Sequence, residues 1–416
     1  MTQQFHFLDR CVGALVFAAA ITTSAVASAG PVVNVADVEQ LYSAVNNPLN
    51  EGAAVVMAPG IYPLSATDPA GKLRAHGGRL ELQRDMSLYG VAGDRAAVVI
   101  DAADPSRMPP SSFTTGVSFG RSGVVRIGIG TNTIEWLTIL GNPAAAAGVA
   151  TELTDPTEPI PASTAIRVAH VVSGGSSRGI DVRNAGMGMN LRRIDAELVD
   201  NELIGPTELQ PGTMSEGIRL ANFVGADGGV IVAILSANRA HGFQLGCIVA
   251  NNRSNNAAIQ VRSSGDRFFA NTLGCQIAGG LSQSTTGVAK SNSTVFEAFG
   301  SKFVDNTPEI GGIEPGGIRV VGGLSTILTN VVSDNTVSVS LTGSKVFGNE
   351  DVLGNVVNFE AFGAIHTALT GIAGTNNHVM ITLRGVSRTI DVIAADSVPV
   401  DPSGSNTVTV LPSPAP

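Results

Sequence analysis

Gly217-Ile218-Arg219-Leu220 is one copy of a short pattern that recurs along the chain and decides its fold. Each copy has a small residue, an apolar residue, a polar residue and a second apolar residue. Two apolar residues around a polar one put alternate side chains inside and outside a β-strand, and internal recurrence is typical of a solenoid. The other copies are Ala165-Ile166-Arg167-Val168, Gly179-Ile180-Asp181-Val182, Gly242-Phe243-Gln244-Leu245, Ala258-Ile259-Gln260-Val261, Gly274-Cys275-Gln276-Ile277 and Gly317-Ile318-Arg319-Val320.

A second pattern places an asparagine after a strand. Asparagine tolerates left-handed backbone angles and can hydrogen-bond to a stacked neighbour, so we expect it at the sharp corner of each coil. The copies are Asp200-Asn201, Ala237-Asn238, Asn251-Asn252, Ala270-Asn271, Asp305-Asn306, Asp334-Asn335 and Gly348-Asn349. Together the two patterns predict an all-β protein, a single-stranded right-handed parallel β-helix of roughly ten to twelve coils. The intervals between copies are unequal, which leaves the register and the face of each copy open.

The start of the chain predicts a cap for this β-helix. Val38, Leu41, Tyr42 and Val45 lie at i, i+3, i+4 and i+7, on one face of an amphipathic helix, and Asn34 is the candidate N-cap. A strand is expected at 54–57. A lone helix before many strands suits the open hydrophobic end of a β-helix, which must be covered to prevent edge pairing.

The segments that follow the helix resemble the first coils of pectin lyase-like proteins. The resemblance is carried by Pro59-Gly60-Ile61-Tyr62, Arg79-Leu80-Glu81-Leu82 and Leu88-Tyr89-Gly90, within residues 35–101. It implies the same architecture for most of the chain. It also implies a ligand of the kind this superfamily uses, usually an acidic plant polysaccharide that lies along an outer face of the coils.

The ends of the chain are expected to differ from its middle. Residues 1–29 read as a secretory signal with an apolar core at 12–21 and Ala27-Ser28-Ala29 before a cleavage site. We therefore expect a secreted, periplasmic or extracellular protein with no membrane span after cleavage. The expected parts are the signal peptide at 1–29, a capping region at 30–50, the β-helix at 51–398 and a flexible tail at 399–416. Surface loops are expected at 102–115, 141–163, 205–215 and 282–292.

Composition limits the classes of ligand. The net charge of −9 gives no electrostatic footprint for nucleic acid. Six histidines and three cysteines are too few and too scattered for a metal-ligand framework, so no metal site is predicted. Calcium stays possible, because the calcium-dependent lyases of the resembling superfamily hold it with carboxylates. Cys247 and Cys275 differ in their repeat positions, so buried free thiols are expected rather than a disulfide, although their pairing is left open.

No complete catalytic constellation is present. The hydrolases of the resembling superfamily carry an Asp-Asp pair that this chain lacks, and Ala240-His241-Gly242 echoes their Gly-His-Gly segment only in part. The best charged group comprises Asp181, Asp195, Asp200, Glu216, Arg183, Arg192, Arg193 and Arg219. Its alternative interpretation is a set of local ion pairs. The weak catalytic candidates are Asp181, Asp195, Arg219 and His241.

The polar residues of the recurring strand are the candidate substrate-binding residues. If the register holds, they form one outward column that suits sugar hydroxyls or carboxylates, or a ladder that satisfies itself. The column comprises Arg167, Asp181, Arg219, Gln244, Gln260, Gln276 and Arg319. His170 and His241 each border a repeated strand and are expected to be ordinary surface or packing residues.

Two functions remain in competition. The first is an exported β-helix that interacts with polysaccharide, with lyase or hydrolase activity left open. The second is a non-catalytic structural or adhesive protein of the cell surface or extracellular space, favoured by the missing catalytic motifs. Fold analogy alone cannot decide between them.

Overall fold

The computed structural model describes residues 30–108, 123–127, 129–142, 147–151, 163–184, 193–209, 214–223, 226–282, 287–306, 315–325, 331–346, 357–366, 375–388, 391–396 and 405–412. The expected signal peptide and Asn349 lie outside these residues. Parts of the expected loops also lie outside them. Within the described parts, the expected loops at 141–163 and 282–292 instead contain strands β10 (Ala147–Thr151) and β23 (Val288–Lys290). No helix in the described part of the chain is long and apolar enough to cross a membrane.

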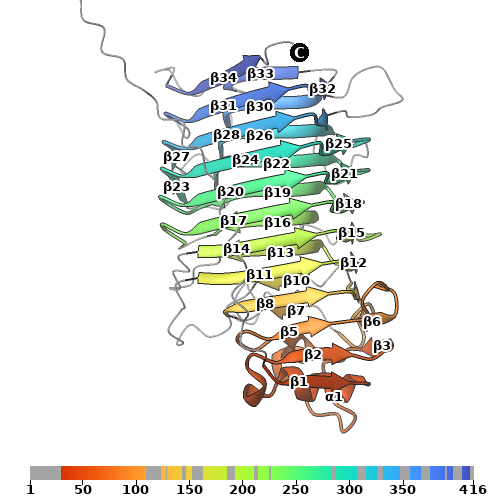
Figure 1. Cartoon of the computed structure of the whole chain (residues 1–416). Coiled ribbons are helices and arrows are strands. Elements are labelled where there is room, and N and C mark those ends of the chain that lie inside the picture. Colours follow the sequence, from red (N-terminus) through yellow and green to blue (C-terminus); the bar gives the residue numbers. More distant parts are fainter. Residues whose placement is uncertain are drawn as a thin grey trace, which may run out of the picture.

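The described chain is a parallel β-helix, as the two sequence patterns predicted. Three long sheets stack their strands from the N-terminal to the C-terminal end, and within the described residues their strands pair in parallel with strands of the neighbouring coils (Figure 1). We call these sheets A, B and C, and their strands are given below. Each coil contributes one strand to sheet A, then one to sheet B and then one to sheet C. Ten complete coils of three strands, from β2 to β33, agree with the ten to twelve predicted.

Sheet A has twelve strands: β1 (Val32–Val35), β2 (Ala54–Met57), β5 (Ser87–Tyr89), β8 (Thr131–Glu135), β11 (Ser163–Ala169), β14 (Arg193–Val199), β17 (Val230–Ser236), β20 (Ala258–Ser264), β24 (Ser293–Phe299), β28 (Thr336–Thr342), β31 (His378–Arg384) and β34 (Thr407–Pro412). Strand β34 pairs with β31, so part of the expected flexible tail instead continues this sheet.

Sheet B has ten short strands: β3 (Gly60–Pro63), β6 (Val98–Asp101), β9 (Thr138–Leu140), β12 (Val172–Gly174), β15 (Glu202–Ile204), β18 (Arg239–His241), β21 (Arg267–Phe269), β25 (Lys302–Val304), β29 (Lys345–Val346) and β32 (Ser387–Arg388). Most have three residues or fewer, so each strand presents its first and third side chains on one face and its second on the other.

Sheet C has ten strands: β4 (Leu80–Glu81), β7 (Gly123–Ile127), β10 (Ala147–Thr151), β13 (Arg178–Asn184), β16 (Glu216–Asn222), β19 (Leu245–Asn252), β22 (Leu273–Ser282), β26 (Gly316–Ser325), β30 (Val357–His366) and β33 (Asp391–Asp396). Strands β23 (Val288–Lys290) and β27 (Val331–Ser333) form a separate pair.

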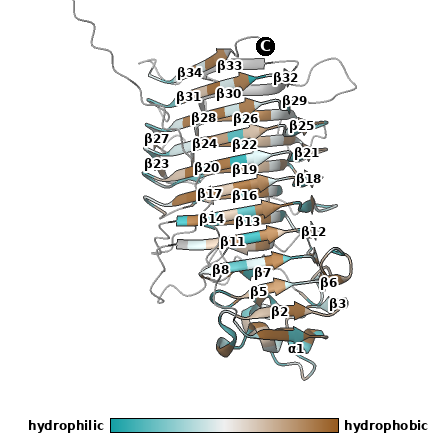
Figure 2. Cartoon of the chain, in the orientation of Figure 1, coloured by the Kyte–Doolittle hydropathy of each residue, from teal (hydrophilic) through white to brown (hydrophobic). Residues whose placement is uncertain are grey.

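The core runs up the inside of the coils. Apolar stretches recur from strand to strand along the stack (Figure 2). Phe268 and Phe303 lie on neighbouring coils with ring centroids 5.2 Å apart, and both are fully buried. Burial of a phenylalanine contributes about 1.5–3 kcal/mol, so repetition of such positions on ten coils stabilises the stack.

The small residue of the recurring pattern has a packing reason in sheet C. A Cβ at Gly217 would lie 2.7 Å from Cβ of Ala240, and one at Gly246 would lie 2.6 Å from the carbonyl oxygen of Gly274. Glycine is needed because the start of each sheet C strand approaches the interior of sheet B and the next coil at these distances.

The N-terminal end of the stack is covered by α1 (Val38–Val45), as predicted. Asp37 is the N-cap, because its carboxylate accepts a hydrogen bond from the backbone nitrogen of Gln40 at 2.8 Å. The expected cap, Asn34, instead lies within strand β1. Two short 3₁₀ helices, Pro48–Asn50 and Ala75–Gly78, complete the helical segments described.

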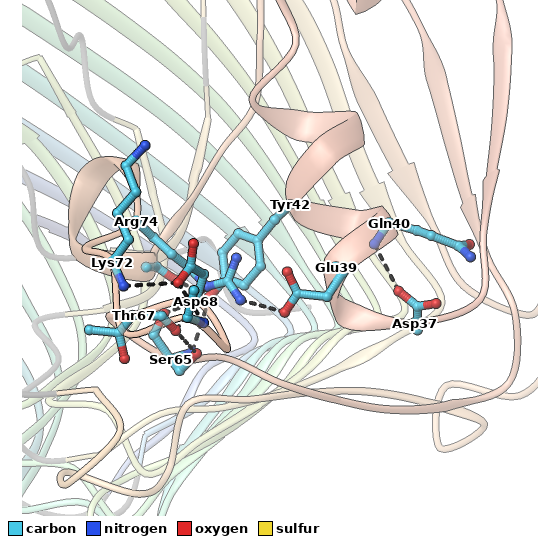
Figure 3. Close-up of polar contacts among 11 residues, drawn as sticks. Asp37, Glu39, Gln40, Tyr42, Ser65, Thr67, Asp68, Lys72 and Arg74 are labelled. Carbon is cyan, nitrogen blue, oxygen red and sulfur yellow. Dashed lines mark hydrogen bonds and ion pairs between the residues drawn. The ribbon is translucent and has the colours of Figure 1, made fainter.

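The loop before Ala75–Gly78 is joined to α1 by a small polar cluster (Figure 3). Tyr42 donates a hydrogen bond to the carbonyl oxygen of Gly78 at 2.6 Å, and the guanidinium of Arg74 lies 4.0 Å from the centre of the Tyr42 ring. Arg74 also forms an ion pair with Glu39. These contacts join the helix to residues 65–78 and so close this end.

The asparagines form buried ladders, but they do not themselves take the left-handed angles. In five of the six described copies the residue before the asparagine does, as in Asp200 with φ 48° and Ala237 with φ 57°, whereas Asn251 and Asn252 lie within strand β19. The asparagine then hydrogen-bonds along the stack, as in Asn335 Nδ2, which donates to Asn377 Oδ1 at 2.9 Å. The sharp corner therefore divides two roles between two adjacent residues.

Cys247 and Cys275 form a disulfide, which corrects the expectation of free thiols. The two residues face each other in the register of β19 and β22, with Cα atoms 4.5 Å apart. The recurring pattern equated Gly242-Phe243-Gln244-Leu245 with Gly274-Cys275-Gln276-Ile277, which placed Cys247 and Cys275 at different positions of the repeat. The true copy is Gly246-Cys247-Ile248-Val249, in which an isoleucine occupies the polar position.

Candidate functional site

The seven candidate substrate-binding residues do not form one column. Asp181, Arg219, Gln276 and Arg319 share a register position on sheet C, with Ile248 between Arg219 and Gln276. Arg167 and Gln260 lie on sheet A, in two different register positions. Gln244 lies in the turn that precedes β19. The four-residue pattern identifies strands correctly, but it occurs on two sheets.

Most of these side chains are also less exposed than an outward column requires. Asp181 is fully buried, and Arg219, Gln244 and Gln276 are buried. Arg319 and Arg167 are half-buried, while Gln260 is exposed. Arg167 forms ion pairs with two carboxylates of sheet A: its Nε lies 2.7 Å from Glu135 Oε1, and its Nη1 lies 2.5 Å from Glu197 Oε1.

Asp181 and Arg219 belong to a buried charge cluster on the outer side of sheet C. Ile180 and Val182 point into the core, so the alternating residues Asp181 and Arg183 point away from it. Arg183 Nε lies 3.2 Å from Asp181 Oδ2, and Arg219 Nε lies 3.9 Å from Asp181 Oδ1. The cluster thus joins neighbouring coils through opposite charges.

Glu216 and Arg178 complete this cluster. Arg178 Nε lies 2.6 Å from Glu216 Oε2, and Arg219 Nη1 lies 3.3 Å from the same oxygen. Sequence analysis placed Glu216, Arg183 and Arg219 together with Asp181 but missed Arg178. Its position directly across from Glu216 in the register of β13 and β16 explains the contact.

The arginines determine the protonation of Asp181. Burial alone raises the pKa of this carboxyl, but the charges of Arg183, Arg219 and Arg178 outweigh it and hold the pKa below its ordinary value. Burial lowers the pKa of the Arg219 guanidinium, and the charge of Glu216 opposes that effect. An ionised carboxylate held among three arginines is suited to holding coils together rather than to donating a proton.

The same register position carries a second pair nearer the N-terminus. Arg126 is fully buried, and its Nη1 lies 2.8 Å from Glu81 Oε2, which also lies 2.7 Å from Nδ1 of His76. Glu81, Arg126, Ala150 and Asp181 follow one another along sheet C. The apolar-polar-apolar pattern of Leu80-Glu81-Leu82 was the sequence signal for this position.

The other weak catalytic candidates lie elsewhere. Asp195 is on sheet A, paired with Arg193 at 2.7 Å. His241 is on sheet B, where its ring stacks on Phe269 with centroids 4.9 Å apart. Burial lowers the pKa of His241, against the charge of Glu202. The four candidates therefore occupy three sheets and do not form one catalytic site.

Sheet B carries a column of basic side chains that sequence analysis missed. Arg239, Arg267, Lys302 and Lys345 occupy the same register position on β18, β21, β25 and β29. All four are exposed. Neighbouring parallel strands lie about 4.8 Å apart, so the backbone positions of these cations repeat at that distance.

An apolar column runs beside the basic one. Ile204, His241 and Phe269 occupy the third position of consecutive sheet B strands, two residues after the register position that Glu202, Arg239 and Arg267 share. The guanidinium of Arg267 lies 4.3 Å from the centre of the Phe269 ring. Sheet B thus presents flat apolar surface next to aligned positive charge.

Metal ligands do not gather in the described residues. No group of three or more histidine, cysteine, aspartate or glutamate side chains in the described ranges could hold a metal ion.

Comparisons with known proteins return weak structural similarity. No protein-family model and no curated protein matches the chain. Solved structures that are similar to it include the Azotobacter vinelandii mannuronan C-5 epimerase AlgE6 A-module (15% identity, TM-score 0.39, 87% of this chain and 95% of that chain), XylC in complex with xylose (8%, 0.25, 89% and 87%) and bacteriophage CBA120 tailspike protein 3 (12%, 0.22, 91% and 59%). At these TM-scores the similarities carry no argument about function, and the fold rests on the strand pairing described above.

Proposed function

We propose that this chain binds an anionic polysaccharide along the outer face of sheet B. The observation that carries the proposal is the exposed column of Arg239, Arg267, Lys302 and Lys345. A ligand lying along the stack, across the strands, meets one cation on each coil. The resemblance of residues 35–101 to pectin lyase-like proteins agrees with an acidic polysaccharide as the ligand class.

The aligned positive charges of the basic column repel one another, and this repulsion destabilises the fold unless a negative charge offsets it. Like charges directly opposite each other on paired strands are destabilising. The chain has 34 acidic and 25 basic residues, so it contains enough carboxylates to pair with every basic side chain. No carboxylate of the described residues lies within 4.0 Å of a charged nitrogen of Arg239 or Lys302, while Arg267 reaches Asp305 only at 4.0 Å. A bound polyanion relieves this repulsion.

The neighbouring apolar column suits the C–H faces of a sugar ring. A pyranose ring has faces of C–H groups as well as charged and hydroxyl substituents. The ring of Phe269 and the side chain of Ile204 offer surface for the C–H faces, while the adjacent cations meet the carboxylates. Because the two columns are parallel, one polysaccharide chain can use both.

The buried cluster on sheet C favours binding without turnover. General acid–base cleavage of a sugar chain needs carboxyl groups that the substrate can reach. Asp181 and Glu216 are buried and already paired with arginines. This observation supports the alternative of a non-catalytic structural or adhesive protein, for which sheet B supplies the adhesive surface.

The test compares two variants that each lose three positive charges. One is Arg239→Ser, Arg267→Ser and Lys302→Ser, and its control is Lys72→Ser, Arg262→Ser and Arg384→Ser, which are exposed basic residues away from sheet B. Binding to polygalacturonate, alginate and neutral xylan is measured at increasing NaCl, because screening weakens charge pairing.

We expect the wild-type chain and the control to bind a polyanion at low salt, and the sheet B variant to lose at least ten-fold in affinity and most of the salt dependence. Equal loss in both variants, or absence of polyanion binding by the wild-type chain, contradicts the proposal. Release of unsaturated products or reducing ends in the same incubations overturns the non-catalytic interpretation.

A further inference from the structure

The turn from sheet A to sheet B carries three unusual residues on consecutive coils. Trp136, His170 and Asp200 take left-handed backbone angles, with φ of 60°, 56° and 48°. The later coils have small residues at this turn: Ala237, Gly265, Gly300, Gly343 and Gly385. Aspartate and histidine are tolerated in this backbone region, whereas a bulky residue such as Trp136 is disfavoured there, and such strain is concentrated at functional sites.

The side chain of His170 contacts those of both Trp136 and Asp200. The rings of Trp136 and His170 stack with centroids 3.9 Å apart and planes 14° apart. The other end of the imidazole is fixed, because His170 Nδ1 lies 3.0 Å from Asp200 Oδ2. The result is an ordered series of indole, imidazole and carboxylate along the corner.

Arg95 and Glu202 frame this series with further polar groups. Arg95 Nη1 donates a hydrogen bond to the carbonyl oxygen of Asp200 at 3.2 Å, and Arg95 Nη2 lies 3.5 Å from Glu202 Oε2. The loop that carries Arg95 is held in place because Thr138 Oγ1 donates to its carbonyl oxygen at 2.9 Å. This loop therefore comes from the second coil and reaches the fifth.

The corner is accessible to a ligand. The side chains of His170, Asp200 and Glu202 are 25%, 46% and 33% exposed, and Arg95 is 30% exposed. Two carboxylates can accept hydrogen bonds from neighbouring sugar hydroxyls, while the guanidinium and the imidazole can donate them. The half-buried indole adds apolar surface.

We propose that the Trp136–His170–Asp200 corner, with Arg95 and Glu202, is a second carbohydrate subsite that binds the hydroxyl groups of one pyranose ring. It adjoins the basic column, because Glu202 is directly across from Arg239 in the register of β15 and β18. In assigning this ring to the same polysaccharide, the inference rests on the proposed function. The column binds charge, whereas the corner binds hydroxyls.

The chain has one tryptophan, so fluorescence excited selectively at tryptophan, outside the absorption of its three tyrosines, reports on this corner alone. The full chain is titrated with polygalacturonate and alginate oligosaccharides and with neutral xylohexaose and cellohexaose. The subsite variant is Asp200→Asn with Glu202→Gln, which keeps the shape of both side chains. The matched control is Asp195→Asn with Glu197→Gln on sheet A. Circular dichroism melting checks that each variant folds.

We expect a saturable change in fluorescence with at least one oligosaccharide. Affinity should fall at least ten-fold in the subsite variant, with an unchanged salt dependence, and should be retained in the control. A polyanion that binds the basic column without changing Trp136 fluorescence overturns the subsite and leaves the proposed function standing. If no polyanion binds, the proposed function fails. A saturable response to a neutral oligosaccharide that the subsite variant loses then still supports the corner, and no response from any sugar overturns it.

Discussion

Asp266 accepts two hydrogen bonds from Asn238, one from the backbone nitrogen at 2.8 Å and one from Nδ2 at 2.9 Å. It occupies the next step of the ladder that joins Asn201 to Asn238, and a third donor, Ser263 Oγ, lies 2.5 Å from its other oxygen. An aspartate accepts with both oxygens, whereas an asparagine offers only one acceptor. Three converging donors therefore explain why a carboxyl group stands here.

The position of Asp266 predicts a pH-dependent stability. Burial raises its pKa to about 6, against the hydrogen bonds from Ser263 and Asn238 that lower it. The folded state therefore binds a proton more tightly than the unfolded chain. The resulting cost, about 3 kcal/mol when the carboxyl is ionised in both states, is relieved progressively as pH falls from about 6 to the ordinary value of 3.8.

Asp266→Asn should remove this dependence. Denaturant unfolding at pH 7.5 and pH 5 is expected to show a larger gain in the free energy of unfolding for the wild-type chain than for the variant. Asp195→Asn, on the surface of sheet A, serves as the control and should keep the wild-type slope. Parallel pH profiles for wild type and Asp266→Asn contradict the assignment.

The disulfide between Cys247 and Cys275 should stabilise the middle of the stack. It closes a segment of 28 residues, which corresponds to about 2–4 kcal/mol. Cys247→Ala with Cys275→Ala is expected to lower the free energy of unfolding by that amount or more, because the side chains are also buried. Mass spectrometry of an unreduced digest should find the two cysteines linked in the wild-type chain, and finding both as thiols would show that the bond is absent.

The buried cluster on sheet C predicts a sharp difference between two aspartates. Asp181→Ala leaves Arg183 and Arg219 without their shared partner in a buried site, so we expect a loss of about 3–5 kcal/mol. Asp195→Ala breaks an exposed pair with Arg193 and should cost less than about 1 kcal/mol. Thermal and urea unfolding of both variants measures the difference. Similar, small losses for both would mean that the sheet C cluster does not hold the coils together.

The repeated sequence pattern predicted the fold because alternation of apolar and polar residues is a local property of each strand. It did not predict the register, because the same alternation serves sheets A and C alike, as Arg167 and Asp181 show. The copy at Gly246-Cys247-Ile248-Val249 was hidden because Ile248 joins an apolar cluster with Leu245 and Leu273 on the outer side of sheet C. An isoleucine there is favourable only in the folded packing.

The basic column could not be predicted from the sequence because its residues are unequally spaced along the chain. Arg239, Arg267, Lys302 and Lys345 are separated by 28, 35 and 43 residues, because the connecting segments between strands differ in length from coil to coil. No fixed period links them. Only the pairing of β18, β21, β25 and β29 brings the four side chains into one line.

The ladder through Asn335 allows a test of how the later coils are held together. Asn335 is fully buried; its Nδ2 donates to Asn377 Oδ1 at 2.9 Å and to the carbonyl oxygen of Ala289 at 3.0 Å. Its Oδ1 accepts from Asn292 Nδ2 at 2.9 Å. Asn335→Ala leaves these partners buried without their hydrogen bonds, each at a cost of about 1–3 kcal/mol. We expect a loss of at least about 3 kcal/mol in denaturant unfolding, whereas Asn34→Ala, at an exposed position of β1, should stay within about 0.5 kcal/mol of wild type. Equal effects of the two substitutions would show that the ladder contributes no more than an exposed asparagine does.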